Sequence, residues 1–535
     1  MGTGSDRISI RSLLGTCAAG LHIVVLLAVV AVPGYALVNA VRALLEVSEP
    51  GQQAALFDPQ RWLVLLGNTV VVCGVALATA TSLGLVLGLL VARTDLPGRT
   101  AIVGVAILGV CVPVYVGMVF IFSLIPLWRF GNSAWLCGLL YGLFYTPLAV
   151  VILAAAFRSA DRDLEDQARL DADLPQILRH VTIPQAGWGI ATLAVLVVLL
   201  VATDFTIADI LMVRTFAEEV YTQYALLRSP AGPVLASLPV LVVMAVLLVA
   251  IQVRYRLLGE HSPWQFGARP RTIPLGRGRS VVAVCCIVVV LTCLGPPAVA
   301  LLMRIESPSA FVTAVGGLQR ELLVSGALAA TGATIVACLG VGLAWAALRT
   351  GRFRWLIWVA IVLLLAVPAP VAGISLIELL NQPGWAGRLY DSPAIIALGY
   401  VVRFLPLGVL LLIPAVQRVP LEVESAARLD GCDWLAAQRH IYWPAIAADA
   451  AIVWLVIAVL CFAEVGCTVL LAPPGWTTAS VRAFTLMHFG VYRDLAALAL
   501  ASVGCILFPW LLLVCLLKRR LMRNRIGSGP GSGRV

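Results

Sequence analysis

The chain has 535 residues, of which 61% are hydrophobic and only 12% charged, and its formal net charge is +10. Soluble globular domains carry about 25% charged residues, so this composition excludes an ordinary water-soluble protein and predicts one embedded in a lipid bilayer. The positive charge does not indicate nucleic-acid binding, because the arginines cluster at the ends of apolar runs, as in membrane proteins.

Membrane spans are the first elements that the sequence predicts. A spanning helix needs roughly 20 predominantly apolar residues. Twelve runs meet this length, at 13–41, 62–92, 101–127, 134–157, 188–212, 235–253, 280–303, 322–348, 355–379, 392–416, 446–471 and 495–517. The first run is too long for the apolar core of a cleaved signal peptide, so it is predicted to be a retained helix.

The basic residues predict the orientation of these spans. With the N-terminus inside, 26 of the 37 lysines and arginines lie in inner segments and 10 in outer segments, while Arg403 lies within a run. The positive-inside rule then places both termini in the cytoplasm. The predicted organisation is a six-span unit, a basic linker, a second six-span unit and a flexible basic tail, at 1–253, 254–279, 280–517 and 518–535.

The two units repeat each other in sequence. Matching residues lie 255 to 260 positions apart: "SLGLVLGLLVART" (82–94) with "CLGVGLAWAALRT" (338–350), "VPVYV" (112–116) with "VPAPV" (367–371), and Pro147 with Pro406. Six spans is an even number, so both units have the same orientation and form parallel repeats related by an axis along the membrane normal. A substrate path is expected between the two units.

Each unit also carries a polar segment between its fourth and fifth spans, at 158–187 and 417–445. In both, an acid is followed four residues later by an arginine, which supports a surface helix; the pairs are Glu165 with Arg169 and Glu424 with Arg428. An ordinary solvated loop is the alternative interpretation. It has no physical need to repeat, so we expect a docking surface.

Both polar segments resemble the EAA loop of permeases in ATP-binding-cassette (ABC) importers, whose pattern is E-A-A-x-x-x-G with a hydrophobic-Pro end. The resemblance assigns a coupling role to Glu165, Ala168, Arg169, Asp171 and Pro184 in the first copy, and to Glu424, Ala426, Ala427, Arg428, Gly431 and Pro444 in the second. The first copy departs from the pattern, because Gln167 replaces an alanine and the glycine is missing after Asp171. The geometry of its bend is therefore in question.

Over nearly the whole chain, the arrangement is similar to the fused twelve-span permeases of the ferric-iron uptake group, to which thiamine permeases are related. The resemblance implies an all-α membrane protein of the type I ABC importer kind, with two parallel six-helix repeats in a bacterial inner membrane. It also implies two partners, an ATPase subunit in two copies that docks on the loops, and a periplasmic binding protein that delivers the solute.

The sequence agrees with a separate ATPase. A phosphate-binding loop needs G-K-[ST], and the single lysine, Lys518, follows Leu517. ATP hydrolysis is therefore expected on another polypeptide. The cysteine and histidine spacings suit neither zinc nor a catalytic centre, so no cofactor, metal or catalytic site is predicted.

Ionisable residues within the spans are further candidates, since burying a charge in a bilayer is costly. Asp204 and Glu464 are repeat-equivalent acids, and Arg403 is expected to pair with one of them. Pro113 and Pro368 occupy equivalent positions, where a proline would kink a helix. The residues alone leave two interpretations open: a lining of the translocation pathway, or structural contacts that fix helix packing.

Two other classes of membrane protein are the alternatives. A secondary transporter of the major facilitator type also has twelve spans in two parallel halves, but it has no need for a repeated polar segment between the fourth and fifth spans. A membrane-embedded enzyme would need a convergent catalytic constellation, and the sequence shows neither H-E-x-x-H nor G-x-S-x-G.

Overall fold

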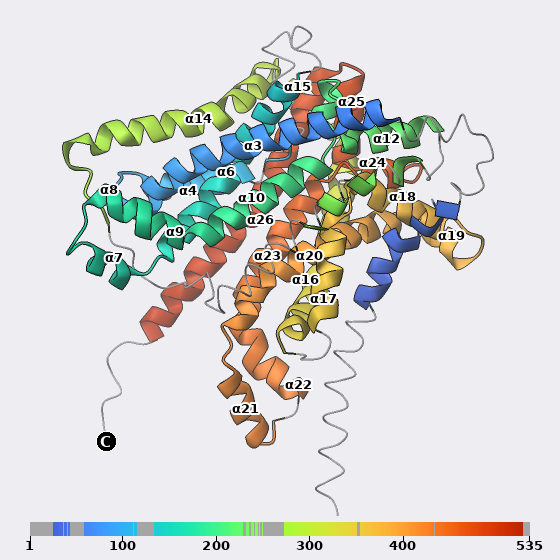
Figure 1. Ribbon diagram of the computed structural model, residues 1–535. Coiled ribbons are helices and arrows are strands. Elements are labelled where there is room, and N and C mark those ends of the chain that lie inside the picture. The colour runs from blue at the N-terminus through green and yellow to red at the C-terminus, as the bar shows by residue number, and fades with distance from the viewer. Residues whose placement is uncertain are drawn as a thin grey trace, which may run out of the picture.

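Helices account for the regular structure of the computed structural model (Figure 1). The structure describes residues 25–35, 37–39, 41–42, 58–110, 112–114, 133–227, 232–234, 237–239, 241–243, 245–246, 249, 272–349, 354–432 and 434–527. In this part, six helices are long and apolar enough to cross a membrane, or up to eight if each of two bent pairs is one span. The chain is thus an all-helical, multi-pass membrane protein, while the prediction of twelve spans in two repeats is not confirmed.

Residues 25–35 are helical, and the labelled helices of the first half begin with α3. They are α3 (Pro59–Arg93), α4 (Arg99–Val110), α6 (Ala134–Arg158), α7 (Arg162–Ala168), α8 (Leu174–Ile177), the π-helix η2 (Leu178–Thr182), α9 (Ile183–Gln185), α10 (Gly187–Thr203), α11 (Thr206–Ile210) and α12 (Phe216–Leu227). The predicted spans 13–41, 101–127 and 235–253 lie partly outside the described residues.

The second half begins with a short 3-10 turn. Its elements are η3 (Gly276–Gly278), α14 (Arg279–Met303), α15 (Pro308–Gly317), α16 (Gln319–Arg349), α17 (Arg354–Ala366), α18 (Ala369–Leu380), α19 (Trp385–Tyr390), α20 (Ala394–Gln417), α21 (Leu421–Leu429), α22 (Trp434–Ala437), the π-helix η4 (Gln438–Tyr442), α23 (Trp443–Ala463), α24 (Thr468–Leu471), α25 (Ala479–His488) and α26 (Tyr492–Gly527). Helix α26 continues ten residues beyond the predicted span, so the tail predicted to be flexible from 518 is helical as far as Gly527.

Local signals explain where several helices begin. The Asp58 side chain accepts a hydrogen bond from the Gln60 amide at 3.0 Å, and Pro59 occupies the first turn of α3. Ser133 caps α6 in the same way through the amide of Leu136, at 3.2 Å. These side chains satisfy amide groups that have no partner within the helix.

Three predicted spans are broken in the structure. The run 355–379 forms α17 and α18, which are bent by 105° at a break where Pro368 is the residue before α18. The runs 188–212 and 446–471 are interrupted at Asp204 and Glu464, both in extended backbone. Hydropathy did not reveal these breaks, because apolar residues continue on both sides of each.

Helices α3 and α6 pack through small residues. Each carries a G-x-x-x-G sequence, "GLVLG" (84–88) in α3 and "GLLYG" (138–142) in α6. A Cβ added at Gly84 would lie 2.5 Å from the Cβ of Ala149, and one at Gly142 would lie 2.6 Å from the Cβ of Thr79. Small residues allow close backbone approach where lipid supplies no hydrophobic driving force between helices.

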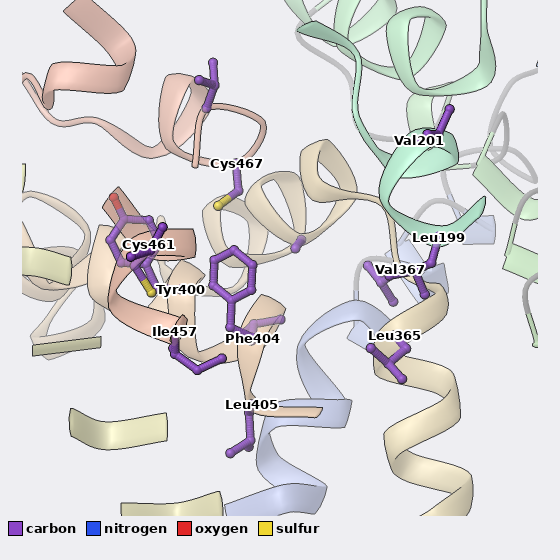
Figure 2. Close-up of a cluster of buried hydrophobic side chains, with 14 of the residues drawn as sticks. Leu199, Val201, Leu365, Val367, Tyr400, Phe404, Leu405, Ile457, Cys461 and Cys467 are labelled. Atoms are coloured by element: carbon purple, nitrogen blue, oxygen red, sulfur yellow. The ribbon is translucent and has the colours of Figure 1, made fainter. Parts of the chain in front are cut away.

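The halves also share a buried core. One cluster contains Leu199 and Val201 of the first half together with Leu365, Tyr400 and other residues of the second (Figure 2). A second cluster joins α3, α4 and α6 to α14 through Ala283, Cys286 and Val290. The first described helix of the second half therefore packs on the first half, an arrangement that no local pattern predicts.

Candidate functional site

A small cavity lies where the two halves meet. Its volume is about 40 Å³, and it is lined by Val114, Thr203, Asp204, Thr206, Ala369, Arg403, Ala463, Glu464, Val465 and Gly466. The three ionisable residues predicted within the spans are thus brought together. Pro113 and Pro368 immediately precede two lining residues, so the structure places all five tentative pathway residues at or beside one cavity. The cavity has room for water but not for a solute of several heavy atoms.

Arg403 links the two halves at this cavity. Its Nε donates to Glu464 Oε2 at 2.8 Å, and its Nη2 donates to the hydroxyl of Thr203 at 3.3 Å. Glu464 and Arg403 belong to the second half, whereas Thr203 ends α10 of the first. The side chains of Arg403 and Glu464 are 13% and 8% exposed. Of the two acids predicted as partners of Arg403, Glu464 is the one that forms the ion pair.

The two acids have matching local roles. Asp204 Oδ1 accepts the amide of Thr206 at 2.6 Å, just before α11. Glu464 Oε1 accepts the amide of Cys467 at 3.0 Å, just before α24. Each carboxylate thus binds a backbone amide at the start of a short helix that follows a broken span, which supports a structural role alongside any role in a pathway.

Sequence reasoning missed one participant, Tyr141 of α6. Its hydroxyl lies 3.3 Å from Asp204 Oδ1 and 3.3 Å from the amide nitrogen of Ile207. The sequence does hold a signal for Tyr141, because the repeat offset of 259 pairs it with a second tyrosine, Tyr400. Both side chains are buried in the structure. A tyrosine within an apolar run has too little polarity to be noticed without that comparison.

A second contact between the halves lies beyond the cavity. His488 Nε2 of α25 is 3.1 Å from Asp209 Oδ2 of α11, while His488 Nδ1 is 2.9 Å from the carbonyl of Phe484. The hydrogen bond with the Asp209 carboxylate raises the pKa of His488 above its ordinary value. The charged imidazolium is therefore favoured at this seam.

The first polar segment is anchored differently from the prediction. Glu165 forms an ion pair with Arg93, at the end of α3, and accepts a hydrogen bond from the hydroxyl of Thr182 at 2.7 Å. Arg169, the predicted partner of Glu165, is exposed. The ion pair at i,i+4 in α7 is instead Arg162 with Asp166, at 3.4 Å. Long-range packing buried the glutamate and so overrode the local pairing.

The remaining coupling candidates lie at the surface or partly buried. Ala168 is the last residue of α7 and is half-buried, as is Ala427 in α21, while Asp171, Pro184, Ala426, Gly431 and Pro444 are exposed. Glu424 and Arg428 belong to α21, but their side chains lie outside the described residues. Gly431 has φ of +77°, the left-handed region that favours glycine. The first copy turns without a left-handed residue, through hydrogen bonds from the amides of Asp171 and Ala172 to the carbonyl of Ala168.

Local structure repeats in the two polar segments. Both contain, near their end, a π-helix with an Arg-His pair, and His180 and His440 each place Nδ1 3.0 Å from the carbonyl four residues earlier. Both also expose a leucine before the bend: Leu170 is 83% and Leu429 is 89% exposed. Figure 1 shows α7 and α21 at the left and lower margins of the bundle, away from α12, α24 and α25.

These features define a multi-pass membrane protein with a small polar cavity between the halves of one chain. Residues 84–261 match the family described as the inner membrane component of binding-protein-dependent transport systems. These residues are therefore similar to the permeases of ABC importers. The match favours the permease over the major facilitator interpretation.

Three curated proteins are similar to the chain. The Fe(3+)-transport system permease protein FbpB 2 of Haemophilus influenzae is 24% identical over 80% of this chain and 84% of its own length. The trehalose transport system permease protein SugB of Mycobacterium tuberculosis is 29% identical over 35% of this chain and 73% of its own. The putative 2-aminoethylphosphonate transport system permease protein PhnV of Salmonella paratyphi A is 26% identical over 41% of this chain and 80% of its own.

Proposed function

We propose that the chain is a transmembrane permease subunit of an ABC importer in a bacterial inner membrane, with both termini in the cytoplasm. Two copies of a separate ATPase subunit bind the polar segments 158–187 and 417–445, and a periplasmic binding protein delivers the solute. The observation that carries this proposal is the repetition of one local structure, a short helix followed by a π-helix, in both polar segments. Two copies of a docking element suit two copies of one partner.

The docking surface is apolar at its tip. Leu170 and Leu429 are separated by the repeat offset of 259, and among the described side chains they are the most exposed leucines of their segments. Leu164 and Val423 have the same offset and are 49% and 42% exposed. Burying a leucine stabilises by about 1.5–3 kcal/mol, so a partner that covers both tips gains affinity from each.

The cavity at the centre supports a path between the halves. Asp204 and Glu464 come from equivalent positions, and Arg403 contacts both halves at once. ATP-driven movement of the polar segments would separate the halves and break the contact from Arg403 to Thr203. In this conformation the contact closes the path.

Ferric iron is the solute that we propose. The support is the iron-transport relative, which matches across both halves of the chain, and the two carboxylates against one guanidinium at the cavity. Within the described residues, no group of three or more His, Cys, Asp or Glu side chains is placed to hold a metal ion. The ion would therefore pass through rather than bind tightly. Thiamine and other small solutes are the alternatives that a transport assay distinguishes.

The test is co-purification with the ATPase. Leu170→Asp and Leu429→Asp should each weaken ATPase association about tenfold, because each removes the burial of one leucine. Leu170→Met and Leu429→Met keep an apolar tip and serve as matched controls that should retain association. ATPase recovered at the wild-type ratio with both aspartate variants combined would contradict the proposed docking.

A further inference from the structure

Arg93 is a buried cation that the pathway does not use. It is the last residue of α3, and it is 1% exposed. Its Nη2 pairs with Glu165 Oε1, while its Nη1 is buried and has no hydrogen-bond partner in the described part of the chain. Glu165 is 5% exposed and therefore supplies the main compensation for this buried charge.

The backbone of the same arginine holds a third segment. The Ile273 amide, from the end of the predicted linker, donates to the Arg93 carbonyl at 2.7 Å. Thr94 and Ile273 form a parallel bridge, and the Leu275 amide donates to Asp95 Oδ1 at 2.8 Å. One residue therefore joins α3, the first polar segment and the chain that leads into α14.

The second half repeats the arrangement in part. Arg349 ends α16 and is separated from Arg93 by the repeat offset of 256. Its Nη2 donates to the carbonyl of Val419, which lies in the second polar segment, at 2.8 Å. In both halves, an arginine at the end of a long spanning helix thus contacts the polar segment of its own half.

We propose that Arg93 is a positioning residue that transmits movement of the first polar segment to α3, an inference that rests on the proposed function. The buried pair prevents α7 from moving without α3, because separating the two would leave both charges buried and unpaired. Helix α3 in turn packs closely against α6 through the glycine contacts, so the displacement passes into the bundle. Glu165 thereby acts inside the permease rather than as a contact for the ATPase.

The test compares ATP hydrolysis with movement at the cavity. A cysteine introduced by Val465→Cys, in a chain with its own cysteines replaced, reports the opening of the cavity through its rate of reaction with a thiol reagent. The complex of the full chain with its ATPase is used, with and without ATP and vanadate, so no knowledge of the solute is needed.

Arg93→Met should keep ATPase association and hydrolysis within about twofold of the parent protein, yet reduce the nucleotide-dependent change in labelling at least tenfold. The charge swap Arg93→Glu with Glu165→Arg should restore much of that change. Arg493→Met removes the exposed pair with Glu306, outside both polar segments. It is the matched control and should leave the labelling change intact.

Two results would overturn the inference. One is a labelling change in Arg93→Met equal to that of the parent. The other is a parallel loss of association, hydrolysis and labelling that the charge swap does not restore, which would show a purely structural role. Failure of the parent protein to bind an ATPase, or to respond to ATP, would instead refute the proposed function.

Discussion

Removing the guanidinium of Arg403 tests whether its buried charge and that of Glu464 stabilise the protein as a pair. Arg403→Met leaves Glu464 buried without its 2.8 Å partner. At that separation and an effective dielectric constant of about 20, the attraction between unit charges is about 6 kcal/mol before desolvation is subtracted. Breaking one side of a buried pair typically costs about 3–5 kcal/mol, because an uncompensated charge is left. We expect a loss of stability in this range.

The partner variant is chosen to change charge and little else. Glu464→Gln keeps a carbonyl oxygen for the Cys467 amide, which Glu464 Oε1 accepts at 3.0 Å, but it leaves Arg403 unpaired. We expect it also to cost about 3–5 kcal/mol, whereas the double variant should lose only about 1–2 kcal/mol, since neither charge remains.

The assay is the free energy of unfolding of the four proteins in bilayer discs, measured as a double-mutant cycle. The wild-type protein, both single variants and the double variant are compared under one condition. If the double variant loses as much as the two single variants added together, the two charges do not depend on each other, and Arg403 and Glu464 do not stabilise the protein as a pair.

Two further predictions concern the packing of α6 on α3 and the contact between His488 and Asp209. Gly142→Leu should destabilise the protein by about 1–3 kcal/mol through overpacking against α3, because even a Cβ at Gly142 would lie 2.6 Å from the Thr79 Cβ. Gly74→Leu is the control and should be neutral or stabilising, since nothing lies within 4 Å of the added Cβ. Equal melting temperatures for the two variants would contradict this packing. His488→Gln should lower the melting temperature most below pH 6.5, which is the ordinary pKa of histidine. The folded state raises the pKa of His488, so this residue stabilises the protein fully below its unfolded pKa and loses that contribution as the pH rises through its folded pKa. The difference should shrink in alkaline buffer and should be absent when Asp209→Asn is the background; a difference that does not change with pH would show that the imidazolium is not what the seam requires.

The membrane class and many of the spans were predictable because hydropathy is a property of composition over about 20 residues. The runs 62–92, 134–157, 322–348 and 392–416 correspond closely to α3, α6, α16 and α20. Breaks within spans were not predictable in the same way. The 105° bend between α17 and α18 depends on what packs around Pro368, and a proline alone does not determine its angle.

Some residues of the candidate site were predictable from the sequence, whereas their arrangement was not. Asp204, Glu464 and Arg403 could be selected from the sequence, since an ionisable residue in an apolar run is conspicuous. Their assembly around one cavity, and the choice of Glu464 as the partner of Arg403, required coordinates. Tyr141 escaped notice because its hydroxyl contributes little to hydropathy, although its repeat-equivalent, Tyr400, was available as a signal.

By itself, the sequence determined that this chain is an apolar, multi-pass membrane protein with two similar polar segments, because composition, periodicity and repetition are local or additive properties. Only the tertiary structure decided that Glu165 turns inward to Arg93 instead of pairing with Arg169, and that α14 packs on the opposite half. The physical reason is that long-range packing decides which oppositely charged groups are buried next to each other, and a buried charge must pair with such a neighbour. An attraction of a few tenths of a kcal/mol between exposed neighbours on one helix does not outweigh that burial.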